Sequence, residues 1–303
     1  LYNGFLSGVS AGGDRFFYQN PLESAGGVER SVYFEVACCP SNLARLMAQL
    51  PGFIYAVRST VDQVGSREPQ SGGDIFVNLF VGSRAQIQLP GGRVGIAQQT
   101  RYPWDGKVRI SVTPDKAREF TLHVRVPGWA REKPVPSDLY RFADRWSEQP
   151  ALRVNGRTVS LGGPDLKVGA YSDGFARIRR RWSPGDVVEL DLPMPVRRVV
   201  AHEGVKADRG RAAIERGPIV YAVEAIDNEG HVSSLVLPLS MVLRHELRPS
   251  LLGGIGVVTG PAVAVDGGGA REVQLTAIPY FAWANRGKGE MAVWLPYETG
   301  RGK

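Results

Sequence analysis

Short runs of alternating apolar and polar residues follow one another along most of this chain, and they constrain its fold more than any other feature. An alternation of period two places every apolar side chain on one face of a β-strand. The spacing between these runs predicts β-sandwiches or a barrel, and not a parallel sheet with crossover helices. The clearest runs in the first two-thirds of the chain are residues 75–81, 108–112, 120–126 and 186–193, together with a predicted hairpin at 152–159 around Asn155-Gly156.

The last third of the chain is also predicted to be rich in strands. The sequence contains 37 Gly and 21 Pro, which favours many short strands joined by turns over long helices. Glycine-rich breaks at 253–256 and 267–269 are predicted turns. The expected strands in this zone are residues 219–223, 232–237, 257–258, 263–265, 273–278 and 291–295.

Helical signals are confined to the first 55 residues. Pro40 suits the first position of a helix, and Leu43, Leu46, Met47 and Leu50 follow at helical spacing until Pro51-Gly52 ends the run. Residues 1–10 are expected to be the end of another helix. The change from helical to strand patterns along the sequence therefore predicts three regions, at residues 1–55, 56–201 and 202–303.

The net charge of +7 raises the question of nucleic-acid binding. Lys and Arg are scattered along the chain, and the densest group, residues 177–181, alternates like a strand with one solvated face. This pattern favours a solvated surface over a nucleic-acid interface. The sequence also has no apolar run of about 18 residues, so no membrane partner is expected.

The only two cysteines, Cys38 and Cys39, are adjacent and directly precede Pro40. A disulfide between neighbours would close a strained ring, so a structural bridge is not expected. One interpretation is a pair of buried thiols that pack like small apolar residues. The other is a pair of thiolates at a helix N-terminus, where the helix dipole favours negative charge and a metal would favour it further. Two cysteines fill only half of a tetrahedral zinc site.

Other groups that could carry chemistry show no telling spacing. None of the four histidines, His123, His202, His231 and His245, forms a spaced pair of metal ligands. His123 lies in a predicted strand, where packing or surface exposure is the simpler interpretation. Three carboxylates, at Glu23, Glu29 and Glu35, lie close enough in sequence to reach a site at the cysteines, although each is more often a surface charge.

Several segments, in order along nearly the whole chain, resemble glycoside hydrolase family 127, the β-L-arabinofuranosidase family. The segment 37–46 around Cys38-Cys39-Pro40 is similar to the cysteine motif of that family. The segment that includes Phe16, Phe17 and Tyr18 is similar to the stretch that closes its helical barrel. The other similar segments are residues 125–129, 210–218 and 278–287.

The resemblance implies a mainly β chain in which two β-sandwich (jelly-roll-like) domains follow the C-terminal remnant of an (α/α)6 barrel. It also implies a retaining glycosidase with zinc held by three cysteines and a glutamate. Cys38 matches the family's nucleophile and zinc ligand, Cys39 matches a neighbouring zinc ligand, and Tyr18 matches a tyrosine that contacts the sugar. The other zinc ligands and the glutamate acid/base lie upstream in the family, so the chain alone is expected to be inactive. The expected partner is an oligosaccharide or glycan substrate, and a homodimer is a possible assembly. Reduced thiols favour a location in the cytoplasm.

A second hypothesis is a non-catalytic carbohydrate-binding or structural β-sandwich module. Its support is the supply of aromatic residues that could stack on sugars, at Trp104, Trp129, Tyr280 and Trp283. Large aromatic residues also dominate sandwich cores, and this is the simpler interpretation of the same residues. A glycan-binding screen discriminates between the two hypotheses, because a chain that binds no glycan leaves the binding module without support.

Overall fold

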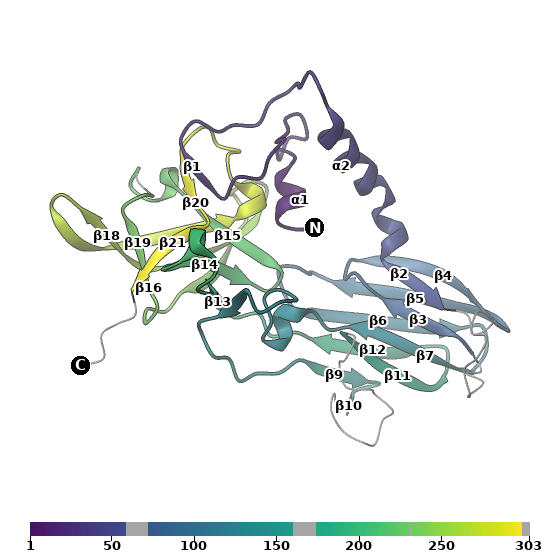
Figure 1. Ribbon diagram of the computed structural model, residues 1–303. Coiled ribbons are helices and arrows are strands. Elements are labelled where there is room, and N and C mark those ends of the chain that lie inside the picture. The colour runs from purple at the N-terminus through teal and green to yellow at the C-terminus, as the bar shows by residue number, and fades with distance from the viewer. Residues whose placement is uncertain (59–71, 160–173, 231, 299–303) are drawn as a thin grey trace. The chain divides into compact units, whose positions relative to one another are not determined.

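The computed structural model describes residues 1–58, 72–159, 174–230 and 232–298 (Figure 1). The chain is divided into two compact units. The first, here called the cysteine unit, consists of Leu1–Met47, Glu132–Trp146 and Pro195–Lys303. The second, here called the middle unit, consists of Ala48–Arg131 and Ser147–Met194. The chain is mainly β with a small helical part, as the sequence predicts.

The middle unit contains two sheets. The larger has six strands in the order β10-β9-β12-β6-β5-β4, and the smaller has four in the order β11-β7-β3-β2. All neighbouring strands are antiparallel except β3 and β7, which run parallel. The strands are β2 (Tyr55–Arg58), β3 (Asp74–Val77), β4 (Ser83–Leu89), β5 (Gly92–Thr100), β6 (Lys107–Pro114), β7 (Arg118–Arg125), β9 (Ala151–Val154), β10 (Arg157–Val159), β11 (Phe175–Trp182) and β12 (Asp186–Asp191).

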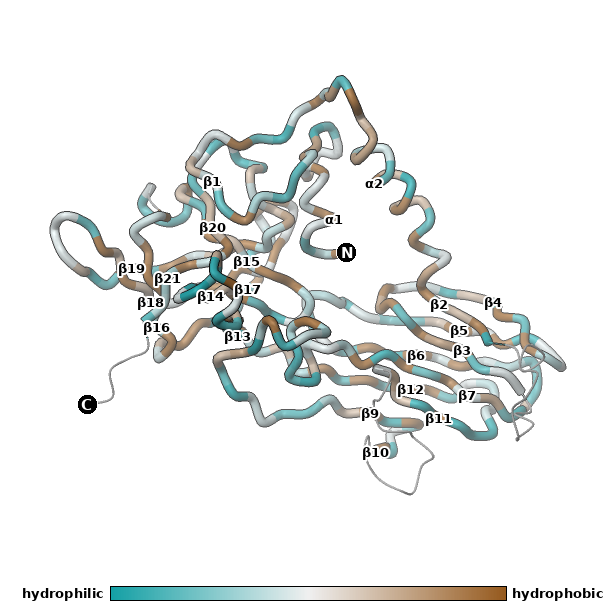
Figure 2. Tube along the Cα trace, viewed as in Figure 1, coloured by the Kyte–Doolittle hydropathy of each residue, from teal (hydrophilic) through white to brown (hydrophobic). Residues whose placement is uncertain are grey.

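Alternation along these strands builds one shared hydrophobic core. Figure 2 shows the hydropathy changing from residue to residue along the strands of this unit. In β6, for example, Val108, Ile110 and Val112 are buried while their neighbours are less so. Residues of both sheets, from Ile75 in β3 to Leu190 in β12, belong to this core. The apolar half of each strand therefore holds the two sheets together.

The predicted hairpin at Asn155-Gly156 is confirmed. Strands β9 and β10 pair antiparallel on either side of it. Both turn residues have positive φ, 51° for Asn155 and 77° for Gly156. Asparagine and glycine are the residues that adopt this conformation at least cost, which is why the dipeptide signals the turn.

The cysteine unit is built on one eleven-stranded sheet. Its main path runs β1-β20-β15-β19-β18-β16-β21-β14-β13-β8, with β17 paired to β18 and an additional pairing of β14 with β15. The strands are β1 (Glu23–Ala25), β8 (Tyr140–Phe142), β13 (Val196–Ala201), β14 (Arg211–Arg216), β15 (Ile219–Glu224), β16 (Leu235–Pro238), β17 (Arg244–Arg248), β18 (Ile255–Asp266), β19 (Gly269–Pro279), β20 (Glu290–Ala292) and β21 (Trp294–Glu298).

Two strands predicted separately, at 257–258 and 263–265, form the single strand β18. Gly260-Pro261 suggests a break in the local pattern. The long hairpin with β19 carries the pairing through it, with Pro261 opposite Gln274. Long-range pairing therefore overrides a local signal here.

The helices are few and short. Helix α1 (Gly4–Ser7) is a single turn, and α2 (Cys38–Gln49) is followed directly by the 3-10 helix η1 (Leu50–Phe53). Helix α2 begins two residues before Pro40, which the sequence had predicted as its first position, and Pro51 lies inside η1. None of the residues of α2 is buried. The remaining 3-10 helices are η3 (Gly128–Arg131), η4 (Lys206–Asp208), η5 (Ala225–Asp227) and η6 (Tyr280–Ala282).

Candidate active site

The adjacent cysteines are the first two residues of α2, and both are free and exposed to solvent. The side chains of Ser41 and Asn42 donate to the carbonyl oxygen of Cys38 at 3.0 and 2.8 Å, which fixes the first turn around it. Backbone N–H groups at a helix N-terminus lack intrahelical acceptors and carry partial positive charge. The sulfurs therefore lie where a thiolate is favoured.

Tyr18 meets Cys38 although twenty residues separate them. The Tyr18 hydroxyl lies 2.8 Å from the Cys38 sulfur. The Tyr18 ring also packs edge-on against Phe34, with ring centroids 5.3 Å apart. The structure thus brings together the two residues predicted as sugar contact and nucleophile.

The Tyr18 contact changes the acidity of both partners. The hydrogen bond from the Tyr18 hydroxyl lowers the pKa of Cys38, and the Cys39 side chain lowers it further. The bond to Cys38 raises the pKa of Tyr18, so the phenol remains the proton donor. A thiolate at Cys38 and a neutral Tyr18 are therefore the mutually stabilising pair.

The two thiols have a separation compatible with a shared metal ion. Their sulfurs lie 3.8 Å apart. Two thiolates bound tetrahedrally to zinc at about 2.3 Å would also lie about 3.8 Å apart. Within residues 1–58, 72–159, 174–230 and 232–298, no third His, Cys, Asp or Glu completes a group that could hold a metal. The thiols fit two positions of a four-ligand site, and the zinc itself stays a prediction.

The three carboxylates near the cysteines in sequence do not join them. Glu23 pairs with Arg211 at 3.1 Å, and Glu29 pairs with Lys288 at 2.9 Å. Both pairs link the N-terminal segment to the C-terminal part of the same unit. Glu35 is exposed.

None of the three described histidines joins the cysteines in a group that could hold a metal. His123 is buried in β7 and stacks on Phe76 with ring centroids 4.1 Å apart, as its position in a strand suggests. His202 is exposed and accepts a hydrogen bond from the backbone N–H of Gly204. His245 is half-buried in β17. His231 lies outside the described residues.

The aromatic residues considered as sugar platforms serve mainly as core. Tyr280 and Trp283 are almost fully buried, and Trp129 packs against the core of the middle unit. Trp104 is half-buried. For Tyr280 and Trp283, this burial favours the core interpretation over a sugar platform. In the arginine-rich strand β11, Arg179 pairs with Glu119, as expected for a solvated face.

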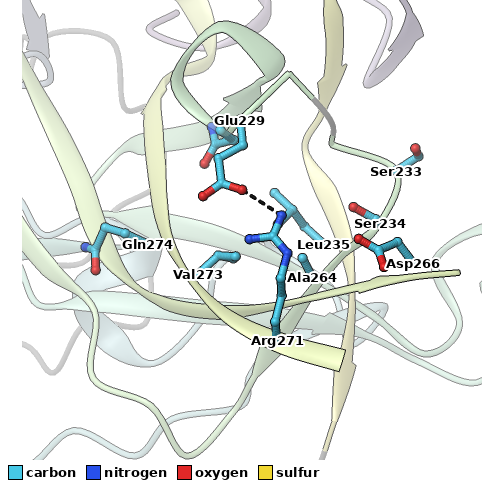
Figure 3. A pocket seen from close by; sticks show the side chains of 10 residues that line it. Glu229, Ser233, Ser234, Leu235, Ala264, Asp266, Arg271, Val273 and Gln274 are labelled. Atoms are coloured by element: carbon cyan, nitrogen blue, oxygen red, sulfur yellow. Dashed lines mark hydrogen bonds and ion pairs between the residues drawn. The ribbon is translucent and has the colours of Figure 1, made fainter. Parts of the chain in front are cut away.

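A separate depression lies beside β18 and β19 (Figure 3). It encloses about 260 Å³, and an ion pair between Arg271 and Glu229, at 2.6 Å, crosses it. None of Tyr18, Cys38 and Cys39 lines it. Among the described residues, no helix is long and apolar enough to cross a membrane.

The segment that carries Tyr18 is fastened to the C-terminal strands, which the sequence patterns did not predict. Strand β1 pairs with β20, and the Tyr280 hydroxyl donates to the carbonyl of Pro21 at 2.8 Å. The Asn3 side chain donates to the Pro218 carbonyl and accepts from the Val220 N–H. These contacts involve two segments singled out above by resemblance, 210–218 and 278–287. Contacts of this kind have no local sequence signal.

Comparison with known families identifies the class of protein to which this fold and thiol pair belong. Three family models match consecutive parts of the chain: the "Beta-L-arabinofuranosidase, GH127 catalytic domain" at residues 1–52, the "GH127 middle domain" at 74–194, and the "Glycoside hydrolase family 127 C-terminal domain" at 196–296. The chain belongs to glycoside hydrolase family 127.

Particular relatives agree with this assignment. The chain is 29% identical to the non-reducing end β-L-arabinofuranosidase of Bifidobacterium longum subsp. longum over 97% of its own length and 44% of the relative's. A solved GH127 β-arabinofuranosidase superposes with a TM-score of 0.87 at 40% identity, over 98% of this chain and 44% of that one. A GH127 β-L-arabinofuranosidase from Geobacillus stearothermophilus T6 gives 0.83 at 38% identity, over 98% and 45%. The chain thus spans less than half the length of these relatives.

Proposed function

We propose that the protein carrying this chain is a retaining glycoside hydrolase of β-L-arabinofuranoside-type glycans, with Cys38 as its nucleophile. The observation that carries the proposal is the contact between the Tyr18 hydroxyl and the Cys38 sulfur at the first turn of α2. The names of the three relatives described above, each an arabinofuranosidase, support the sugar class.

The chemistry requires a thiolate that is ionised and held in place. The Cys38 thiolate attacks the anomeric carbon, so that a C–S bond forms while the bond to the leaving oxygen breaks and a general acid protonates that oxygen. We propose that this general acid is a carboxyl group outside the residues described here, which becomes a carboxylate when it gives up its proton. Water then attacks the same carbon, the proton of the water passes to this carboxylate, and the Cys38 thiolate leaves. Tyr18 holds its hydroxyl at the sulfur and contacts the sugar beside it.

Zinc is part of the proposal. Cys38 and Cys39 would supply two of its ligands, as the 3.8 Å separation of their sulfurs allows. When bound, zinc keeps thiols ionised at neutral pH. The cysteine-bearing helix α2 would belong to the end of a helical catalytic barrel at residues 1–55. The residues after it would form two β-sandwich domains, at 56–201 and 202–303.

The test uses the full-length gene product and a synthetic β-L-arabinofuranoside. Cys38→Ser should lower kcat by several orders of magnitude, about 10⁴-fold or more, because an alcohol at this position is not ionised. Zinc content measured by elemental analysis should be close to one per chain in the wild type. A metal-free wild type with full activity, or a Cys38→Ser variant with unimpaired turnover, would contradict the proposal.

A further inference from the structure

Arg30 is a buried cation inserted between the Tyr18-bearing segment and the loop that follows β19. Its side chain is only 3% exposed. Nε and Nη2 donate to the carbonyl of Ser7 at 3.1 and 2.9 Å, and Nη1 donates to the carbonyl of Trp283 at 2.7 Å. A third carbonyl, that of Phe281, accepts a longer bond from Nη2 at 3.4 Å. A planar guanidinium can join several fixed acceptors in this way.

The same arginine reaches the residues that precede Tyr18. Its guanidinium carbon lies 4.4 Å from the centre of the Phe17 ring, and that ring stacks on Trp283 at 5.0 Å. Phe16 and Ser31 exchange two backbone hydrogen bonds, at 2.8 and 2.9 Å. The residue next to Arg30 is therefore paired with the second residue before Tyr18.

The loop that accepts these bonds is itself anchored to the sheet. Arg286 pairs with Glu224 and Asp227. The Ala284 N–H donates to Glu224 at 2.8 Å. A continuous set of contacts thus runs from β15 through the 281–286 loop to Arg30 and on to Phe17.

Arg30 remains charged in this environment. Burial lowers the pKa of Arg30 to about 10, and Tyr280 and Glu224 oppose that shift. A pKa of about 10 leaves the guanidinium protonated at neutral pH, so its hydrogen bonds are charge-assisted. Removal of the guanidinium would take away both of its hydrogen bonds to the Ser7 carbonyl and the shorter of the two side-chain hydrogen bonds to the Trp283 carbonyl.

We propose that Arg30 is a positioning residue that holds the Tyr18 hydroxyl at the Cys38 sulfur by clamping the segment 16–31 onto the C-terminal sheet. The inference rests on the proposed role of Cys38 as nucleophile. We place Arg30 in contact with neither the Cys38 sulfur nor the sugar. It acts through Phe17 and the Phe16–Ser31 pair.

The kinetic test compares Arg30→Ala, Arg30→Lys and a matched control in the full-length gene product. Misplacement of a catalytic group by about 1 Å typically costs about 100-fold, so Arg30→Ala should lower kcat by about that factor with KM changed less than about threefold. Arg30→Lys should retain an intermediate kcat because an ammonium can bond the same carbonyls. Guanidinium ion at low millimolar concentration should partly restore Arg30→Ala.

The matched control is Arg198→Ala. Arg198 is as buried as Arg30 and also donates to backbone carbonyls, those of Pro238 and Met241, in addition to pairing with Asp144. Loss of this arginine tests the cost of removing any buried cation from the unit. Its kcat should stay within about twofold of wild type. An Arg30→Ala variant that folds and turns over at the wild-type rate, or that loses no more kcat than Arg198→Ala, would overturn the inference.

Hydrogen exchange of the full-length gene product supplies a readout independent of activity. The amides of Phe16, Phe17 and Ser31 should exchange at least about tenfold faster in Arg30→Ala and unchanged in Arg198→Ala. Unchanged exchange in Arg30→Ala would overturn the positioning role. A wild type without arabinofuranosidase activity would instead refute the proposed function, and the exchange data would still decide whether Arg30 holds this segment.

Discussion

At the scale of single residues, the Tyr18–Cys38 contact depends on two groups whose acidities change in opposite directions. The phenol donates to the sulfur, which lowers the pKa of Cys38 and raises that of Tyr18. Both side chains lie at the surface, so solvent screens any charge effect and a direct hydrogen bond is the stronger contribution. The first turn of α2 adds its own preference for the thiolate.

Tyr18→Phe should raise the pKa of Cys38 because the variant lacks the donated hydrogen bond. At pH values near the thiol pKa, the thiolate fraction and the alkylation rate of Cys38 should fall several-fold, by about two to ten times. Alkylation of metal-free protein by iodoacetamide, followed by mass spectrometry across a pH series, measures this directly. Tyr33→Phe, at a more exposed tyrosine, is the control. Identical pH profiles for Tyr18→Phe and wild type would show that the hydroxyl does not act on the sulfur.

Glu215 in β14 gives a second residue-level prediction, about stability. Burial raises the pKa of Glu215 to about 8, although Arg197, opposite it on β13, opposes the shift. In the unfolded chain a glutamate titrates near about 4.3. The raised pKa favours the folded state fully below about pH 4.3, and this contribution is lost as the pH rises through about 8.

Glu215→Gln, which cannot ionise, should therefore flatten the pH dependence of stability. Relative to wild type, the variant should become more stable as the pH rises from about 5 to about 9. Urea unfolding at these two pH values measures the difference, with Glu203→Gln, at an exposed glutamate, as the control. An unchanged difference between Glu215→Gln and wild type at the two pH values would refute the raised pKa.

At the scale of elements, the β9–β10 hairpin shows how one residue can serve both a turn and a neighbouring strand. The Asn155 side chain donates to Asp186 at 2.8 Å and accepts from the Val187 N–H at 2.9 Å. It does so while adopting a φ of 51°. The turn is thus tied to β12 as well as to its own strands.

Asn155→Ala should destabilise the protein by about 1–3 kcal/mol, because it removes both side-chain hydrogen bonds. Alanine also has no local hydrogen bond that would compensate for the cost of its Cβ at positive φ. Asn155→Gly tolerates the backbone conformation but also lacks the bonds. The difference between the two variants in urea unfolding isolates the backbone contribution. If Asn155→Ala had the same free energy of unfolding as wild type, the hydrogen bonds between the turn and β12 would not contribute to stability.

The bounds of helix α2 agree only in part with the local sequence signals for the start and end of a helix. The apolar spacing predicted a helix at 40–50, and the structure has α2 at Cys38–Gln49. Proline is favoured early in a helix but does not define its first residue, because the residues before it can also be helical. The two-residue difference bears on the proposed role of the cysteines, because it makes both of them part of the first turn.

At the scale of the whole molecule, exposed apolar side chains concentrate at the N-terminal end. Among the described residues, nine of the sixteen exposed large apolar side chains lie in residues 1–57. Val32, Tyr33 and Val36 are the most exposed of these. Exposed apolar side chains such as these favour contact with another protein surface.

Val32→Ser/Val36→Ser should reduce the concentration-dependent self-association of the 303-residue chain, because it removes apolar area from this surface. The matched control is Ile226→Ser/Val242→Ser. The control residues are 63% and 69% exposed, close to the 63% and 68% of Val32 and Val36. Light scattering over a concentration series measures the association. Equal effects of the two double variants would show that this surface has no special role.

The sequence by itself determined the mainly β architecture, the hairpin at Asn155-Gly156 and the helix at the cysteines. These features depend on the side-chain period and on turn chemistry, which act over a few residues. Only the tertiary structure decided that Tyr18 reaches Cys38 and that Arg30 donates to Ser7 and to Trp283, the latter 253 residues after Arg30. Such contacts follow from which strands pair, and β1 pairs with β20 through a register that no local pattern encodes.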